Sequence, residues 1–398
     1  MNQSIIYLDH AAATPVNKKA LAAMQPYWQE QFFNPSAPYL PAKAVREAYE
    51  TAKSKIAHHL GAKAPDLVMT SGATESNALA ASVVSTSGKT LLLSTEHPSM
   101  RSAASQVANS AISSPKSQKY DEIKVLPTGV IDLADLRTKL TPDVELISIS
   151  LANNELGVIQ PLAEVAEIIR TERLRRLEQG NKHPLYLHSD ASQALSLLQI
   201  NVSRLGVDLL TLNSAKVGGP KGVGALYVGH GVRLRPLIPG GGQERGLRGG
   251  TENVPGAIGF AAALTEAQAH LQSNRKKYQK LATILRTELQ DAAIQPVFLG
   301  TSKKQLASFV PVSFPGLDAE RLIFKLEAQQ VYLSTGAACA ANKGTKSHVL
   351  TAIGLDDATI AGSLRISLGP TNDEAQIHKA AELIKHAVAA EAERLQHV

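Results

Sequence analysis

"DLLTLNSAKVGGPKGVGALYVG", residues 208–229, contains two short apolar runs separated by a turn rich in glycine. Short apolar runs bounded by glycine and proline are typical of buried strands. Runs of the same kind precede it, with helical patterns between them, at 66–70, 90–94, 145–150 and 185–189. Because parallel strands need crossover helices, this alternation predicts an α/β fold with a mostly parallel sheet covered on both faces. Functional groups are then expected at the carboxyl ends of the strands.

The last third of the chain has a different pattern, which begins after the glycine-rich segment 240–260. It contains a long helical stretch at about 257–292, and then further strands and helices at 308–314, 318–328, 331–335, 364–369 and from 373 onward. We therefore predict two domains. The large α/β domain comprises residues 16–262, and a smaller α+β domain comprises 1–15 and 263–398.

The composition is that of a folded globular protein. Of the 398 residues, 44% are apolar and 19% are charged, and the net charge of +6 is small for this length. No basic block suggests nucleic-acid binding, and the mild positive charge weakly favours acidic partners or an anionic cofactor. The densest basic stretch, 170–182, is interpreted as the solvent-exposed face of an amphipathic helix. The apolar positions of this helix are Leu162, Val165, Ile169, Leu174 and Leu177.

A single cysteine, Cys339, excludes an internal disulfide and hence a secreted disulfide scaffold. Residues 1–15 do not have the basic and apolar regions of a signal peptide. No apolar stretch reaches the roughly 20 residues that a membrane span requires. From these features we expect a soluble cytoplasmic protein without a membrane partner, and we predict no metal site.

The turn after the apolar run 208–214 contains two lysines, Lys216 and Lys221. Lys216 stands at the end of the predicted strand, whereas Lys221 lies inside the turn, where water solvates it. A desolvated lysine has a lowered pKa and becomes a usable nucleophile. Asp190 ends the preceding strand, where it either caps a helix or holds a cationic ring nitrogen. A lysine and an aspartate at strand ends are what pyridoxal 5'-phosphate requires, which favours Lys216 as the reactive amine.

"TSGATESNALA", residues 70–80, connects a predicted strand to a predicted helix. Backbone N–H groups at the start of a helix, next to a hydroxyl group, are suited to binding a phosphate. The alternative is that Ser71 or Thr74 simply caps the helix.

These segments, together with others in the same order, resemble the cysteine desulfurases, pyridoxal-phosphate enzymes related to the class V aminotransferases. The matching segments cover nearly the whole chain and are YLDHAAATP (7–15), FNPSA (33–37), TSGATESN (70–77), TEHPS (95–99), NNELGVIQP (153–161), SDASQ (189–193), the turn 216–228, GGGQERGLRGGTENVP (240–255), STGAACA (334–340) and LRISLG (364–369). The resemblance implies the type I fold of pyridoxal-phosphate-dependent transferases, with a large domain built on a seven-stranded sheet, and it implies a homodimer.

The resemblance also implies catalytic roles. Lys216 would bind the cofactor covalently and move the Cα proton, and His97 would stack on the ring and take part in proton transfer. Cys339 would accept the substrate sulfur as a persulfide. Without the resemblance, His97 would be an ordinary loop histidine and Cys339 a small core residue.

Further residues are implied to hold the cofactor and the substrate. Asp190 would bind the pyridine nitrogen, Gln193 the ring hydroxyl, and Thr251 the phosphate of the partner subunit. Arg365 would clamp the substrate carboxylate, a task suited to its planar fork, although by itself it could be an ordinary charge at a strand edge. The residues expected to contact the cofactor are Ala73, Thr74, His97, Asn154, Asp190, Gln193, Ser214, Lys216 and Thr251, and those expected to contact the substrate are Arg365 and Asn154.

The expected reaction converts L-cysteine to L-alanine and leaves sulfur on Cys339 for an acceptor protein in iron–sulfur or transfer-RNA thiolation chemistry. The nine residues between Cys339 and Val349 resemble the longer-loop, iron–sulfur branch of the family. The alternatives are a selenocysteine lyase, another β-lyase, or a scaffold protein that binds little cofactor.

The chain departs from the family pattern at three places. Ala215 replaces the histidine that usually precedes the lysine and serves the phosphate, and Tyr39 stands where a histidine is common. One lost hydrogen bond is worth about 1 kcal/mol, or about 2 kcal/mol when it is made to a charged phosphate, so we expect weaker cofactor retention rather than its loss. The chain ends at Val398 without the tail by which the family docks a scaffold, which argues against the standard iron–sulfur partner.

Overall fold

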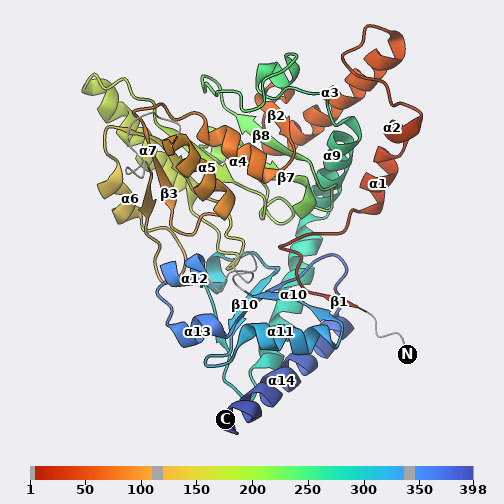
Figure 1. The fold of residues 1–398 in the computed structure, drawn as a ribbon, viewed down its shortest axis with the longest axis vertical. Helices are drawn as coiled ribbons and strands as arrows, with labels where there is room; N and C mark the ends of the chain where they lie inside the picture. The colour runs from red at the N-terminus through yellow and green to blue at the C-terminus, as the bar shows by residue number, and fades with distance from the viewer. Residues whose placement is uncertain (1–4, 110–119, 336–345, 398) are drawn as a thin grey trace.

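The computed structural model describes residues 5–109, 120–335 and 346–397. Figure 1 shows two layered regions, one above the other. The upper region contains the segments coloured from red to green, and the lower region is built mainly from the blue C-terminal segments. Helix α10 (Leu271–Leu289) leads from the upper region into the lower one.

The upper region is organised on a seven-stranded sheet. In spatial order its strands are β2 (Leu67–Thr70), β8 (Gly224–Val228), β7 (Leu209–Asn213), β6 (Tyr186–Asp190), β5 (Val144–Ser148), β3 (Lys89–Leu93) and β4 (Tyr120–Ile123). Neighbouring strands are parallel, except that β8 is antiparallel to both of its neighbours. The predicted fold, a mostly parallel seven-stranded sheet, is therefore confirmed.

Helices cover both faces of this sheet. On one face, α4 (Ala73–Ala81) and α5 (Pro98–Asn109) contribute to a core that includes Val68, Leu92 and Leu209. On the other face lie α3 (Leu40–Leu60), α7 (Leu162–Glu178) and α9 (Val254–Ala269). No helix was expected specifically at 98–109, where α5 forms. The buried residues of α5 whose side chains are described are Met100, Ala103 and Ala104, and two of these three are small alanines.

The buried face of α7 differs from the prediction. Leu174 and Leu177, which we expected on the apolar face, are 49% and 73% exposed. Glu172 and Arg176 are buried in their place, because they continue the 3.6-residue spacing set by the first turns of the helix. The Arg176 guanidinium donates to Glu172 and to the carbonyl of Val144, so the buried charge is paired.

The lower region contains a four-stranded antiparallel sheet with strands β12 (Ser334–Thr335), β13 (Ser363–Ser367), β10 (Phe309–Ser313) and β9 (Val297–Phe298). A separate parallel pair joins β1 (Ile6–Tyr7) to β11 (Val331–Tyr332). The run 331–335 was predicted as one strand. Its two halves belong to different sheets, because 331–332 pairs with the N-terminal strand and 334–335 with β13.

The predicted long helix at 257–292 is two helices, α9 and α10, which meet at the non-helical residue His270. Helix α9 packs on α3 and α1 (Lys18–Met24) in the upper region, whereas α10 packs on α14 (Glu374–Gln396) in the lower one. The remaining helices are α2 (Pro26–Gln29), α6 (Leu133–Lys139), α8 (Val202–Leu205), α11 (Ala319–Glu327), α12 (His348–Ala352) and α13 (Asp357–Ala361).

The domain boundary near residue 262 stays a prediction. Among the described residues, no helix combines the length and the apolar character needed to cross a bilayer.

Candidate active site

Lys216 follows β7 in a short 3-10 turn, where its amine is half-buried. The Nζ atom donates hydrogen bonds to the backbone carbonyls of Ala11 (2.7 Å) and Ala12 (2.5 Å). The Nε2 atom of Gln193 donates to the same Ala11 carbonyl at 3.0 Å. The structure thus brings together Lys216 and Gln193, as predicted from the sequence, and adds an N-terminal segment far away in the chain. Lys221 is exposed in the turn, as expected.

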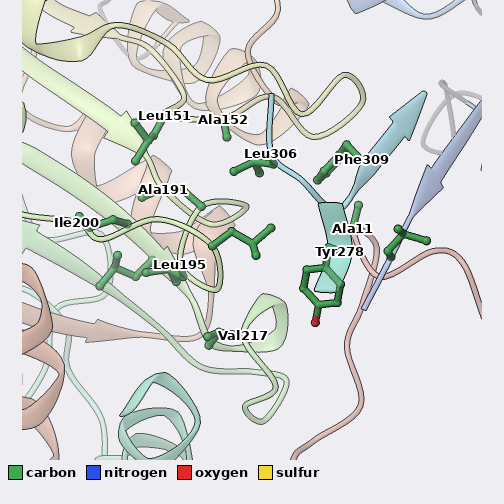
Figure 2. Close-up of a cluster of buried hydrophobic side chains, with 14 of the residues drawn as sticks. Ala11, Leu151, Ala152, Ala191, Leu195, Ile200, Val217, Tyr278, Leu306 and Phe309 are labelled. Atoms are coloured by element: carbon green, nitrogen blue, oxygen red, sulfur yellow. The ribbon is translucent and has the colours of Figure 1, made fainter. Parts of the chain in front are cut away.

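The backbone around these residues is held by the core. Figure 2 shows the buried side chains of Ala11, Ala191 and Val217, each of which adjoins a residue of the site. They pack in one cluster with Phe309 and Tyr278 from the lower region. Because the interior is closely packed, the Lys216 turn and the end of β6 have little freedom to move relative to each other.

A cavity of about 300 Å³ lies beside Lys216 at the junction of the two regions. Gln193 also borders it, together with His10, Asn274 and Tyr278. Burial lowers the pKa of His10 to about 4, so its imidazole is neutral at pH 7. There is therefore space for a ligand next to the Lys216 amine.

Asp190 ends β6 and is 7% exposed. Its Oδ1 accepts the backbone N–H of Ser192 at 2.9 Å, and its Oδ2 accepts the Nδ2–H of Asn77 at 3.0 Å. No helix begins at this residue, so helix capping does not explain it. Two hydrogen-bond donors stabilise the charged carboxylate inside the protein, which suits it to hold a cationic ring nitrogen.

His97 follows β3 on the next polar segment and is largely buried. Its Nδ1 atom lies 2.8 Å from the Ser99 hydroxyl and accepts the Ser99 backbone N–H at 3.1 Å. Burial lowers the pKa of His97, the charge of Asp190 opposes that shift, and the charge of Lys216 adds to it. The charges of Asp190 and Lys216 therefore both act on His97. Their positions after three strand ends agree with the expected location of functional groups.

Two buried titratable groups in this area were missed by the sequence analysis. Glu96 is fully buried, and its carboxylate accepts from the backbone N–H and the hydroxyl of Ser150. Burial raises the pKa of Glu96 to about 7. His188 is also fully buried between hydroxyl groups, and burial lowers its pKa to about 4. Glu96 belongs to the TEHPS motif, in which a role was assigned only to the neighbouring His97.

Helix α4 begins at Ala73 and Thr74, the predicted phosphate site. Its N-cap residue is Gly72, with φ of 148°, and no side chain caps the helix. The alternative of simple capping by Ser71 or Thr74 is therefore wrong. Glycine is favoured at position 72 because a side chain is strained at that φ. Gly224, the first residue of β8, is restricted for a different reason, since a Cβ added to Gly224 would lie 2.7 Å from the Gly72 Cα atom. The uncapped N–H groups remain suited to an anion.

Ser214 is fully buried, and its hydroxyl has no hydrogen-bond partner among the described residues. Such a group is costly unless something else satisfies it. Thr251 is exposed and borders a separate cavity of about 130 Å³, together with Ser71 of the same chain. Its predicted contact with a partner subunit stays a prediction.

Arg365 lies on β13 and is 5% exposed. Its Nη2 atom binds the Asp9 carboxylate at 2.7 Å, and its Nη1 atom donates to the backbone carbonyl of Asn154 at 3.2 Å. The Nε atom is buried without a hydrogen-bond partner in the described part of the chain. The predicted pair Arg365 and Asn154 is thus brought together. Asp9, which pairs with this arginine, was not singled out by the sequence analysis.

Cys339 lies outside the described residues. The chain is next described at residue 346, close to one buried and one partly buried contact. The Ser347 hydroxyl donates to Glu155 at 2.6 Å, and the His348 Nε2 atom lies 2.9 Å from the Glu96 carbonyl. Burial raises the pKa of Glu155 to about 7, against the lowering effect of the Ser347 hydrogen bond.

Comparisons with known proteins agree with the motifs. The family model for class V aminotransferases matches residues 6–379. A cysteine desulfurase IscS from Methanosarcina thermophila is 36% identical over 392 residues, covering 96% of this chain and 92% of that protein. The structure of a NifS-like protein has a TM-score of 0.87 at 30% identity and covers 97% of this chain and 100% of that one. The structure of SspA in complex with cysteine has a TM-score of 0.77 at 31% identity and covers 92% of this chain and 100% of that one.

Proposed function

This chain belongs to the class V aminotransferase family, and we propose that it acts as a cysteine desulfurase that uses pyridoxal 5'-phosphate. The single observation that carries the proposal is the convergence of Lys216, Asp190 and His97. A half-buried amine, a buried carboxylate and a neutral imidazole are gathered after three strands of one sheet. The names of relatives that match nearly the full length support the same activity.

The residues present fit the cofactor. The hydroxyl of Ser214 and the first N–H groups of α4 are hydrogen-bond donors without side-chain partners, and they would bind its phosphate. The Asp190 carboxylate would bind the ring nitrogen, and Gln193 the ring hydroxyl. When bound, the cofactor supplies an electron sink that weakens bonds to the Cα atom of an amino acid. Ala215 offers no hydrogen-bonding side chain, so this chain has one phosphate donor fewer than the family pattern.

The chain's own groups orient the substrate and move protons. The Arg365 guanidinium would bind the carboxylate of L-cysteine in place of, or beside, Asp9. The Lys216 Nζ atom would leave the carbonyls of Ala11 and Ala12 and carry the Cα proton. The low exposure of Asp190 and Arg365 keeps water from competing for their charges. A related structure with bound cysteine supports this substrate.

Sulfur transfer is proposed to use Cys339. Its thiolate would attack the sulfur of the substrate, so that the Cβ–S bond breaks and an S–S bond forms. The carbon fragment takes up a proton and leaves as L-alanine. One cysteine and one thiol thus become one alanine and one persulfide, and no outside oxidant is needed. The persulfide would then pass to an acceptor protein, and the protein would work as a homodimer.

The test is to incubate the purified full-length protein, loaded with cofactor, with L-cysteine and a thiol reductant. We expect equal amounts of alanine and sulfide, and we expect Cys339→Ala to abolish both. Full alanine production by Cys339→Ala would contradict the persulfide role. A higher rate with selenocysteine that does not need Cys339 would indicate a selenocysteine lyase, and a protein that takes up no cofactor would indicate a scaffold.

A further inference from the structure

We propose that Asn77 and Ser99 are positioning residues that tie His97 to Asp190 and hold the His97 imidazole with its proton on Nε2. The inference deepens the proposed function, because it assigns the protonation state of a residue placed in the active site. It is carried by a continuous set of hydrogen bonds between helices α4 and α5. Neither Asn77 nor Ser99 belongs to the residues expected to contact cofactor or substrate.

The first link is the side-chain amide of Asn77, which is fully buried on α4. Its Nδ2 atom donates one hydrogen to Asp190 Oδ2 at 3.0 Å and the other to Ser99 Oγ at 2.9 Å. Both amide hydrogens are therefore used. The Oδ1 atom of Asn77 is buried and has no hydrogen-bond partner among the described residues.

The orientation of this amide follows from its neighbours. If the amide were reversed, Oδ1 would face the Asp190 carboxylate at 3.0 Å, and two acceptors would repel each other. An unsatisfied buried oxygen is unfavourable, and the chain tolerates that cost to place two donors. The two hydrogen bonds donated by the amide NH2 group therefore explain why an asparagine is found at position 77, whereas its carbonyl oxygen makes no hydrogen bond within the described residues.

The second link is Ser99, at the start of α5. Its hydroxyl oxygen accepts from Asn77, so its own hydrogen is free to be donated to His97 Nδ1 at 2.8 Å. The backbone N–H of Ser99 points to the same Nδ1 atom at 3.1 Å. A backbone N–H can only donate, which makes Nδ1 an acceptor.

Neutral imidazole carries one proton, so the proton of His97 must be on Nε2. Burial lowers the pKa of His97, which agrees with a neutral ring that accepts at Nδ1. In this form His97 offers an N–H donor from Nε2 and has no free lone pair to act as a base. The Cα proton is then left to the Lys216 amine.

The inference is tested by NMR of the full-length, cofactor-loaded protein with ¹⁵N-labelled histidine, in which long-range ¹H–¹⁵N correlations distinguish the two tautomers. The His97 signals are assigned as those lost in His97→Asn. We expect the wild type to show a single Nε2–H tautomer. In Asn77→Ala, Ser99 no longer receives its hydrogen bond, and we expect His97 shifts that move towards those of mixed tautomers. An Nδ1–H pattern in the wild type, or unchanged His97 signals in Asn77→Ala, would overturn the proposal.

A second variant guards against poor folding of Asn77→Ala. Ser99 is only partly buried, so Ser99→Ala is expected to fold, and it removes the hydroxyl while leaving the backbone donor. We expect a change in the His97 shifts at least as large as in Asn77→Ala, because Asn77 acts on His97 through this hydroxyl. The matched control is Ser105→Ala on the same helix, whose hydroxyl donates to the Arg101 carbonyl and has no other hydrogen-bond partner in the described part of the chain. A change of the same size in Ser105→Ala would overturn the assignment to Ser99.

The kinetic readout separates this inference from the proposed function. We expect Asn77→Ala to lower kcat for alanine formation by about tenfold, the cost of one hydrogen bond to a charged group. The KM for cysteine should stay within about twofold, because Arg365 is untouched. If the wild type makes no alanine, the proposed function fails while the NMR result still stands. A variant with raised KM and unchanged kcat would contradict a positioning role.

Discussion

The site is built from two regions that the chain assembles in different ways. The strand-end region contains Asp190, which ends β6, and Lys216 and His97, which lie in the segments that follow β7 and β3 of the same sheet. The Arg365 region joins Arg365 to Asp9 and Asn154, and the first two of these are 356 residues apart. The first region follows from the order of the strands, whereas the second exists only when the N-terminal segment, the 153–156 turn and β13 have come together. Mutations in the two regions should therefore change different kinetic constants, with kcat falling in the strand-end region and KM rising in the Arg365 region.

The largest effect is expected at the strand-end region. Lys216→Ala should lower kcat for alanine formation by about a thousandfold or more, because no other amine takes its place. Borohydride reduction of the loaded wild type, followed by peptide mapping, should mark Lys216. Lys221→Ala is the matched control and should keep its activity, since Lys221 is exposed. A mark on residue 221, or on none, would refute the assignment.

In the Arg365 region, the expected effect is on substrate binding. Arg365→Lys should raise the KM for cysteine by about a hundredfold, since a point charge cannot replace the planar fork. The control is Arg321→Lys, which also changes an arginine paired with a carboxylate, but an exposed one. Steady-state kinetics with both variants provide the measurement. An unchanged KM in Arg365→Lys would mean that the substrate carboxylate binds elsewhere.

A pH effect would sharpen the comparison, because Glu155 lies beside the Asn154 of the Arg365 region. Burial raises its pKa to about 7, so the folded state holds a proton that the unfolded state loses near pH 4.5. The stabilisation is complete below pH 4.5 and is lost as the pH rises to about 7. Glu155→Gln should remove this loss, which is worth at most about 3 kcal/mol.

The measurement for Glu155→Gln is urea denaturation at pH 5 and at pH 8. The variant should gain stability relative to the wild type at pH 8 and gain little at pH 5. Glu164→Gln, at an exposed position on α7, is the control. Equal pH dependence of the wild type and Glu155→Gln would show that Glu155 does not titrate in this range.

The smallest expected effect concerns Ser214. Its hydroxyl has no partner in the described chain, so Ser214→Ala should change the free energy of unfolding without cofactor by less than about 1 kcal/mol. If the hydroxyl binds the phosphate, cofactor affinity should fall by about tenfold. Cofactor titration followed by visible absorption measures the second quantity. A loss of stability with unchanged affinity would assign Ser214 to the fold alone.

The sequence by itself determined the sheet and the strand-end region. Strand periodicity, crossover helices and the positions of Lys216 and Asp190 depend on patterns within a few residues of each other, so they can be read locally. The motifs also identified the family, and they placed Arg365 and Asn154 in one site before any contact was known. The α4 start was located correctly, but its capping was not, because whether a hydroxyl turns towards the helix depends on its surroundings.

Only the tertiary structure decided which charges are paired and buried. The Arg365–Asp9 pair, the Asn77–Ser99 link and the buried Glu155 all join segments separated by tens to hundreds of residues. Their pKa values and hydrogen bonds depend on desolvation and on distances that arise only when the chain has closed. Local sequence patterns do not determine those distances. The reactive residues at the strand ends could therefore be predicted from the sequence, whereas the contacts that orient them could not.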